Sequence, residues 1–202
     1  MVRHDIDHYY SEEPKSPLRI GKIVFSFQGS TFHLITASGI FSSRQVDAAT
    51  RLLIEYAKVP KDARVLDLGC GIGVIGIVIA TIHPDTEVVL TDVNKRAVFI
   101  AKQNVDRLSL DNAEVYHQNK FERTAKPYDT ILLNPPMAAG RAICFEMIKE
   151  AKDYLKVGGT LQIVARHNKG GSVLAQKMKE VFGNVEELAK KGGFRVYLSH
   201  RT

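Results

Sequence analysis

From residue 63 onward the sequence alternates between short apolar runs and helical segments, and this alternation constrains the fold more than any other feature. We expect helices over residues 73–82, 95–108, about 141–155 and 171–182. Alternation of this kind predicts a mostly parallel α/β sheet covered by helices on both faces. Only KKGG separates the last two runs, too short for a crossover, so these two strands must be antiparallel. The seven predicted strands are RVLDLG, EVVLTD, AEVYHQ, YDTILLN, TLQIVAR, VEELAK and FRVYLSH.

The first 42 residues differ in pattern from the rest of the chain. The stretch GKIVFSFQGSTFHLITASGIF predicts a strand, a Gly-Ser turn and a second strand. We therefore expect an N-terminal extension with a β-hairpin over residues 1–42 and an α/β domain over residues 43–202. A capping-box pattern from Ser42 to Gln45 predicts the start of a helix with Asp47 inside it. Asp47 could be a salt-bridge partner there, and its place within GIFSSRQVDAAT also favours a role near the entry of the site.

Composition limits the class of protein. A chain of 202 residues with 45% hydrophobic content is enough for one domain with a substantial core. Because no apolar run reaches membrane-spanning length and the N-terminus does not resemble a secretion signal, we expect no membrane association. Cys70 and Cys144 lie in unrelated contexts, which indicates reduced thiols and a cytoplasmic protein, and no Cys/His spacing predicts a metal site. The net charge of +6 favours RNA or DNA as a partner, but charge alone is weak evidence because lysine-rich surfaces also favour solubility.

The stretch VLDLGCGIGVIG predicts a strand, a glycine turn and the start of a helix. Gly71, Gly73 and Gly76 satisfy the pattern G-x-G-x-x-G, and Asp92 ends the next strand. The pattern fits a dinucleotide site, with Asp92 on the ribose, and it also fits a tight turn that binds nothing. Asp67 argues against a dinucleotide, since its carboxylate would repel a pyrophosphate. S-adenosylmethionine carries an ammonium group instead and is the ligand that fits better.

Several motifs together resemble a known family. VLDLGCGIG, TDVN and NPPM resemble class I S-adenosylmethionine-dependent methyltransferases that modify amino nitrogens. HYYSEEP, FHLITASGIFSSRQVDAATRLL, NPPMAAGRA and GGFRVY resemble the small-subunit ribosomal RNA guanine-N2 methyltransferases (the methyltransferase small domain family) and their single-domain archaeal relatives. The glycine motif is widespread, whereas its combination with GIFS and NPP is much more specific. The resemblance covers nearly the whole chain and implies a Rossmann-like class I fold, with a seven-stranded, mostly parallel sheet whose last strand is antiparallel.

The resemblance also implies a set of cofactor-binding residues. The glycine loop would hold the methionine end, and Asp92 would accept hydrogen bonds from both ribose hydroxyls. Asn119 stands where relatives commonly place an Asp that accepts a hydrogen bond from the adenine amino group; an Asn carbonyl still accepts this bond, without charge. The implied set is Asp67, Gly69, Cys70, Gly71, Gly73, Asp92, Val93, Asn119, Lys120, Phe121 and Asn134.

The stretch TILLNPPMAAG ends an apolar strand in an amide followed by two prolines. An exocyclic amine such as guanine N2 is a poor nucleophile because its lone pair is delocalised into the ring. Asn134 and the Pro135 carbonyl would accept both of its N–H bonds, and the prolines would hold these acceptors stiffly for direct in-line transfer without a metal. The alternative is that Asn134-Pro135-Pro136 only terminates the strand; the expected position of this strand end at the cofactor crevice favours a catalytic role.

Met137 completes the expected catalytic group of Asn134, Pro135, Pro136 and Met137. Many amino-methyltransferases carry Tyr or Phe at this position, which can stack on a flipped base, whereas methionine offers a more flexible contact. Phe41 or Phe25 would be an alternative stacking platform. For Phe25, packing within the hairpin is favoured over base stacking. For Phe41, the two roles are equally favoured.

Basic residues are expected at the same edge of the sheet as Asn134. The loops RHNKGG and KKGG follow strand ends there, as do Arg141 and the pair Lys95-Arg96, so these side chains could contact RNA phosphates. The residues assigned to substrate binding are Phe41, Arg141, Arg166, Lys169 and Lys191.

The expected function is methyl transfer from S-adenosylmethionine to guanine N2 of ribosomal RNA or of a small-subunit particle. Two alternatives remain open from the residues. One is methylation of another planar amine, in tRNA guanine, adenine N6 or protein glutamine. The other is an RNA-binding module that has lost catalysis. The two-domain bacterial relatives carry a second, degenerate copy of the fold, so this chain could act as a monomer or as a homodimer.

Overall fold

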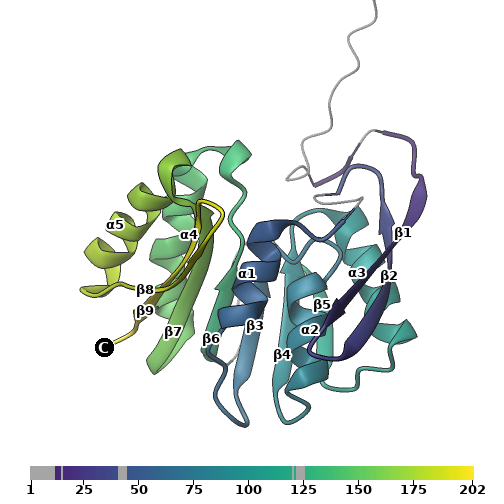
Figure 1. Cartoon of the computed structure of the whole chain (residues 1–202), viewed down its shortest axis with the longest axis horizontal. Helices are drawn as coiled ribbons and strands as arrows, with labels where there is room; N and C mark the ends of the chain where they lie inside the picture. Colours follow the sequence, from purple (N-terminus) through teal and green to yellow (C-terminus); the bar gives the residue numbers. More distant parts are fainter. Residues whose placement is uncertain (1–11, 15, 41–44, 120, 122–125) are drawn as a thin grey trace, which may run out of the picture.

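The computed structural model describes residues 12–14, 16–40, 45–119, 121 and 126–202. Its centre is a seven-stranded sheet with the order β5-β4-β3-β6-β7-β9-β8 (Figure 1). All neighbours are parallel except β9, which is inserted between β7 and β8 and is antiparallel to both. The predicted seven-stranded α/β sheet with an antiparallel last strand is thus confirmed. The strands are β3 (Arg64–Leu68), β4 (Glu87–Asp92), β5 (Ala113–His117), β6 (Tyr128–Leu133), β7 (Leu155–Arg166), β8 (Glu186–Lys191) and β9 (Phe194–His200).

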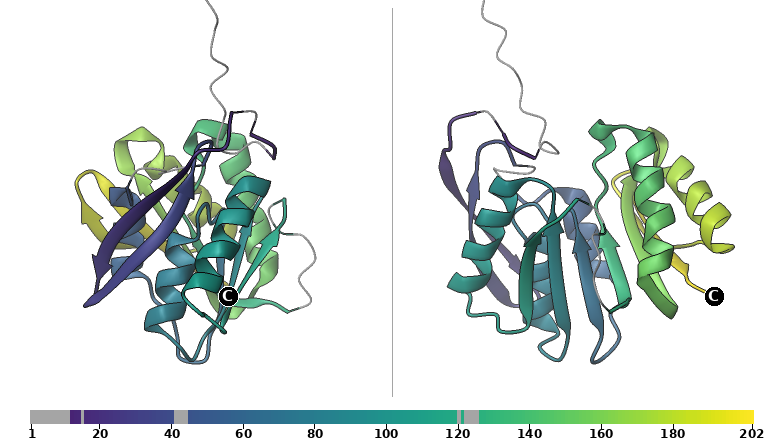
Figure 2. Two further views of the ribbon diagram at one scale, coloured as in Figure 1. Left: turned by 90° about the vertical axis from the view of Figure 1, so that its right-hand side faces the viewer. Right: turned by 180° about the vertical axis from the view of Figure 1, so that it is seen from behind.

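Helices cover both faces of this sheet (Figure 2). Side chains alternate between the two faces along each strand, so that Leu132 joins one apolar cluster whereas Ile131 and Leu133 join the other. The first cluster packs under α1 (Ala48–Tyr56), α2 (Val74–Ile82) and α3 (Lys95–Arg107). The second packs under α4 (Arg141–Tyr154) and α5 (Gly171–Phe182). Short 3-10 turns, η1 (Met137–Ala139) and η2 (His167–Lys169), precede α4 and α5.

The predicted hairpin is present as β1 (Ile20–Phe27) and β2 (Ser30–Ala37), which form a separate two-stranded sheet along α3 (Figures 1 and 2). Asn104 of α3 fixes it, because its Oδ1 accepts a hydrogen bond from the Ile35 N–H at 2.8 Å and its Nδ2 donates to the Ile35 carbonyl at 2.9 Å. Phe25 is buried and stacks on Phe32 with ring centroids 5.0 Å apart, so its role is packing. The expected boundary between residues 42 and 43 lies outside the described residues and remains a prediction.

Two element boundaries differ from the prediction. Helix α1 begins at Ala48 with Asp47 as its N-cap, so the capping box was placed too early; Ser42 itself lies outside the described residues. Asp47 takes this role because its Oδ1 accepts from the N–H groups of Ala49 and Thr50. Strand β7 begins at Leu155, earlier than predicted, because Leu155 pairs with Tyr128 of β6.

The strand order reverses beside β3, which has β4 on one side and β6 on the other. In open parallel sheets such a reversal leaves a crevice at the carboxyl ends of the strands, and that is where such folds place their ligands. None of the helices in the described part of the chain is long and apolar enough to cross a membrane.

Candidate functional site

A pocket of about 260 Å³ opens at this crevice. It lies at the carboxyl ends of β3, β4 and β6. The first turns of α1 and α2 border it on one side, and the first turns of α4 border it on the other. The polar side chains that line it are Asp47, Thr50, Thr91, Asp92, Gln118, Asn119, Asn134 and Glu146. The apolar lining includes Ile40, Val46, Val93, Pro136, Ile143 and Met147.

The glycine loop between β3 and α2 forms the floor of the pocket. Gly69, Gly71 and Gly73 all have positive φ angles, of 72°, 57° and 90°, a region that other residues rarely adopt. A Cβ on Gly69 would meet no atom within 4 Å, so the backbone angle rather than crowding requires glycine there. Gly76 differs, because a Cβ on it would lie 2.5 Å from Cγ of Leu90. The loop thus presents bare backbone to the pocket while α2 packs closely on β4.

Asp92 ends β4 and lines the pocket beside this loop. Its Oδ2 accepts a hydrogen bond from the Gly71 N–H and its Oδ1 accepts one from the Asn94 N–H, both at 2.8 Å. Burial raises the pKa of Asp92, while these backbone hydrogen bonds and His117 act in the opposite direction. Each carboxylate oxygen keeps a further lone pair, so Asp92 can accept two more hydrogen bonds from a vicinal diol.

Asp67 lies beneath the glycine loop rather than in the pocket lining. Its Oδ2 accepts a hydrogen bond from the Gly76 N–H at 2.8 Å, and its Oδ1 has no partner among the described residues. Burial raises the pKa of Asp67 to about 7, the Gly76 N–H opposes this rise, and the charge of Asp92 adds to it. Asp67 therefore holds the loop and the first turn of α2, and it does so with a carboxyl group that is costly to ionise.

Asn134 follows the end of β6 and is half-buried in the pocket wall. Its Nδ2 donates to Oγ1 of Thr50 at 3.1 Å, and no described residue donates to its Oδ1. The Thr50 hydroxyl in turn donates to Oδ2 of Asp47 at 2.7 Å. The amide is therefore held by α1, with its carbonyl oxygen left as a free acceptor.

The residues after Asn134 lie differently from expectation. Pro136 lines the pocket, whereas Pro135 does not, and the Pro135 carbonyl already accepts the Met137 N–H at 2.8 Å. Met137 lies outside the pocket lining, with its methyl group close to Gly170 in the turn before α5. The turn η1 thus uses the Pro135 carbonyl and directs Met137 toward the neighbouring loop.

The other residues expected at the cofactor divide into two groups. Cys70, Val93 and Asn119 line the pocket, and their contact with a cofactor remains a prediction. Phe121 does not, since it is buried against Tyr154 with ring centroids 4.8 Å apart. Lys120 lies outside the described residues.

The basic residues assigned to substrate lie around the pocket and not in its lining. Arg141 and Lys169 are exposed at the starts of α4 and α5. Arg166 lies over the ring of Phe194, 4.9 Å from its centroid, and Lys191 lies 3.9 Å from Glu55. Phe41 lies outside the described residues. Arg141, Arg166 and Lys169 share the carboxyl edge with the pocket. Lys191 also lies at this edge, level with Arg166 across β9, but on the outermost strand β8.

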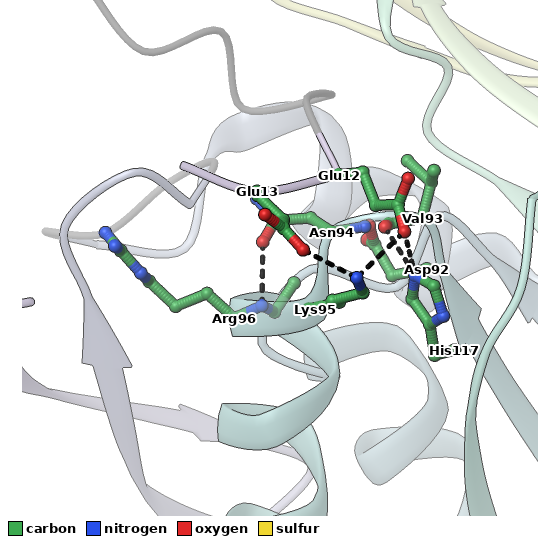
Figure 3. Close-up of polar contacts among 9 residues, drawn as sticks. Glu12, Glu13, Asp92, Val93, Asn94, Lys95, Arg96 and His117 are labelled. Carbon is green, nitrogen blue, oxygen red and sulfur yellow. Dashed lines mark hydrogen bonds and ion pairs between the residues drawn. The ribbon is translucent and has the colours of Figure 1, made fainter. Parts of the chain in front are cut away.

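Lys95 and Arg96, expected to contact phosphates, are both engaged by other residues of the chain, and Figure 3 shows this for Lys95. Nζ of Lys95 contacts Glu13 at 2.7 Å and Glu12 at 3.1 Å. The Arg96 guanidinium donates to the carbonyls of Ser16 and Ser38, both at 2.8 Å. The pair therefore fastens the segment before β1 to the start of α3, and it is not available to phosphates in this arrangement.

Sequence reasoning did not place Thr50, Ile143, Glu146 or Met147 in the pocket. Thr50 follows the cap residue Asp47 by three positions, a spacing that would have indicated contact once the start of α1 was known. The α4 residues carry no such local signal, because it is the packing of α4 on β7 that brings them to the pocket.

A seven-stranded sheet of this order, with an inserted antiparallel β9 and a carboxyl-edge pocket between a glycine loop and Asn-Pro-Pro, defines a class I methyltransferase. The sequence model of the methyltransferase small domain matches residues 31–198, so the chain belongs to this family of S-adenosylmethionine-dependent methyltransferases.

Several relatives are similar to this chain over most of its length. A Bacillus subtilis (strain 168) protein described as uncharacterized, YbxB, is 32% identical over 94% of this chain and 96% of its own length. Ribosomal RNA small subunit methyltransferase C of Haemophilus influenzae (strain ATCC 51907 / DSM 11121 / KW20 / Rd) is 32% identical over 94% of this chain. The chain spans only 58% of that methyltransferase.

Among solved structures, a 16S rRNA methyltransferase of Thermus thermophilus in complex with AdoMet and guanosine superposes with a TM-score of 0.78 at 22% identity. The match covers 94% of this chain and 52% of that one. It confirms the Rossmann-like methyltransferase fold.

Proposed function

We propose that this protein transfers the methyl group of S-adenosylmethionine to an exocyclic amino group, guanine N2 of ribosomal RNA. The observation that carries the proposal is the orientation of Asn134: its Nδ2 is engaged by Thr50, and its Oδ1 is a free acceptor in the same pocket as Asp92. A methyl acceptor with two N–H bonds can donate one of them to such an oxygen, which turns its nitrogen lone pair toward the methyl group.

The pocket residues fit the proposed cofactor. The carboxylate of Asp92 accepts from both ribose hydroxyls, using the lone pairs that Gly71 and Asn94 leave free. The bare backbone at Gly69 and Gly71 admits the methionine portion closely. Val93 provides an apolar contact for the adenine ring, and the Asn119 carbonyl accepts from its amino group. Asp67 acts from below, by holding the loop.

S-adenosylmethionine supplies an electrophilic methyl group on a sulfonium. Oδ1 of Asn134 accepts one N–H of the target amine and turns the nitrogen lone pair toward that methyl group. With the cofactor bound, the amine nitrogen would form a C–N bond as the C–S bond of the sulfonium breaks, and the methylated nitrogen would release a proton to water. The Pro135 carbonyl already accepts the Met137 N–H, so only its second lone pair remains for the other amine hydrogen.

Ribosomal RNA is the proposed substrate for three reasons. The relatives named as ribosomal RNA methyltransferases align over 94% of this chain. The chain is basic, with a net charge of +6. The exposed Arg141 and Lys169, together with Arg166, lie at the pocket edge, where they would contact phosphates without reading sequence. A cytoplasmic location follows from this substrate.

The chain spans just over half of the curated ribosomal RNA methyltransferases. An additional RNA-binding surface would come from a second copy in a homodimer or from the ribosomal particle itself. A monomer acting on an assembled particle fits the same site.

The test is methyl transfer from labelled S-adenosylmethionine to small-subunit ribosomal RNA, to tRNA and to total protein in parallel, with the product identified by mass. N2-methylguanosine in ribosomal RNA is the expected result. The same nucleoside in tRNA would change the substrate and keep the chemistry. Label in N6-methyladenosine or methylglutamine would overturn the guanine assignment. Cofactor binding without methyl transfer to RNA, particles or protein would favour a non-catalytic RNA-binding module.

A further inference from the structure

We propose that Asp47 and Thr50 are positioning residues that set the direction of the Asn134 amide and so decide that an oxygen, not an NH₂ group, meets the target amine. This inference rests on the proposed function, because it assigns Asn134 to the amine. It concerns a hydrogen-bonded relay from Asp47 through Thr50 to Asn134, which joins the first turn of α1 to the end of β6.

The relay has a single possible polarity. An ionised Asp47 only accepts hydrogen bonds, so the Thr50 hydroxyl must donate its one hydrogen to Oδ2 of Asp47, at 2.7 Å. Oγ1 of Thr50 then has only lone pairs left, and it accepts from Nδ2 of Asn134 at 3.1 Å. Because Asp47 only accepts, the Thr50 hydroxyl can only accept from Asn134, and this fixes the orientation of the Asn134 amide.

The direction matters because the two ends of an amide are nearly equal in size and opposite in hydrogen-bonding character. With the relay intact, Oδ1 of Asn134 is the free end. A flipped amide would present two N–H donors to the two N–H donors of the target amine, an arrangement that repels the substrate. An amide without a fixed partner would populate both directions, and only one fraction of the enzyme would be competent.

The relay is anchored to rigid structure. Oδ1 of Asp47 accepts from the Ala49 N–H at 2.9 Å and the Thr50 N–H at 3.1 Å, so the helix cap fixes the carboxylate. Thr50 is only 6% exposed, so little room remains for water to take over its hydrogen bond. All three side chains border the pocket in which the proposed reaction takes place.

Asp47→Asn tests the polarity without removing the cap. Its amide oxygen must face the Ala49 and Thr50 N–H groups, since an NH₂ group there would oppose two donors. The NH₂ group of the new side chain therefore donates to Thr50. The Thr50 hydroxyl then turns and donates to the oxygen of Asn134, so this oxygen no longer faces the substrate. We expect kcat to fall about 100-fold, as for loss of one preorganised group in an active site. The KM for S-adenosylmethionine should stay within about threefold of that of the wild type, since Asp92 and the loop are unchanged.

Two Thr50 variants separate positioning from packing. Thr50→Ser keeps the hydroxyl and is expected to retain kcat within a few-fold of the wild type. Thr50→Val keeps the shape and removes the hydroxyl, and it is expected to lower kcat by less than Asp47→Asn does, because the released amide still presents its oxygen in a fraction of the molecules. Asp111→Asn makes the same charge change at an exposed loop before β5, at the opposite edge of the sheet, and serves as the matched control. Thermal unfolding of every variant checks the fold.

The side-chain amide resonances of Asn134, assigned by their loss in Asn134→Ala, give a readout that needs no turnover. They should shift in Asp47→Asn and Thr50→Val and stay in place in Asp111→Asn. Unmoved resonances in Asp47→Asn, or a kcat that remains at the wild-type level, would overturn the relay. A wild-type protein that methylates no amine would refute the proposed function, and the resonances would still decide whether the relay exists.

Discussion

At the scale of single residues, some residues of the site could be predicted from short sequence motifs and others could not. The glycine loop, Asp92 and Asn134 were predicted because each stands at the end of an apolar strand, and parallel strands bring such ends together. Asp67 was expected to touch the cofactor, yet the period of two along β3 turns its side chain toward α2, where it accepts the Gly76 N–H. The glycine motif therefore located the end of β3 correctly, but it did not give the direction in which each side chain of that strand points.

Asp92→Ala should weaken binding of S-adenosylmethionine by about 1.5–3 kcal/mol, because the ribose hydroxyls lose a charged acceptor. The same change frees the Gly71 N–H, so the loop should loosen as well. Calorimetric titration of the wild type, Asp92→Ala and the control Asp111→Asn measures the effect. A dissociation constant equal to that of the wild type would remove Asp92 from the cofactor site.

The buried carboxyls Asp67 and Asp92 should make the stability of the protein depend on pH. Burial is the main cause that raises the pKa of both, to about 7 for Asp67. Between about pH 4 and 7 the folded chain therefore holds a proton that the unfolded chain has released. The stabilisation is fully present below the unfolded pKa and is lost as the pH rises through the folded pKa, so the free energy of unfolding should fall toward neutral pH.

For Asp67, the rise from 3.8 to about 7 corresponds to an upper limit of roughly 4 kcal/mol. Urea unfolding of the wild type and of Asp67→Asn at about pH 5 and about pH 8 measures the difference. The variant keeps an oxygen for the Gly76 N–H and should show a smaller decrease with pH. An equal decrease in both proteins would mean that Asp67 does not retain its proton in the folded chain.

At the scale of elements, strong periodicity made the strands and most helices predictable. The predicted ranges for α2, α3, α4 and α5 agree with the structure to within one residue, because each has a clear apolar face and a glycine or polar cap. The start of α1 was predicted too early, because Asp47 is the N-cap of this helix. The insertion of β9 between β7 and β8 has no local signal, because strand order depends on packing between distant segments.

Gly76 provides a test of the contact between α2 and β4. Gly76→Ala would bring a Cβ to 2.5 Å from Cγ of Leu90, so we expect it to lower the free energy of unfolding by about 1–3 kcal/mol through overpacking. Combining it with Leu90→Ala should relieve the clash, so the double variant should be less destabilised than the two single effects added. Strictly additive effects in urea unfolding would show that α2 accommodates the methyl group by moving.

At the scale of the whole molecule, the carboxyl edge of the sheet carries the pocket beside the glycine loop and several basic residues near it. Asp47, Thr50, Ile143, Glu146 and Met147 reach this pocket only because α1 and α4 pack against the sheet near β6, which explains why the sequence alone did not place the last four there. The N-terminal segment is held near the same edge by Lys95 and Arg96, through Glu13 and the Ser16 carbonyl. The family, the fold and the pocket together support S-adenosylmethionine-dependent methyl transfer. In the proposed mechanism, that activity depends on Asn134.

The most direct test compares wild type and Asn134→Ala for methylation of small-subunit ribosomal RNA, with the product nucleoside identified by mass and cofactor affinity measured on the same samples. We predict N2-methylguanosine with the wild type and no transfer with Asn134→Ala, while the variant binds S-adenosylmethionine within a few-fold of the wild-type affinity. Methylation by Asn134→Ala at the wild-type rate would contradict the account.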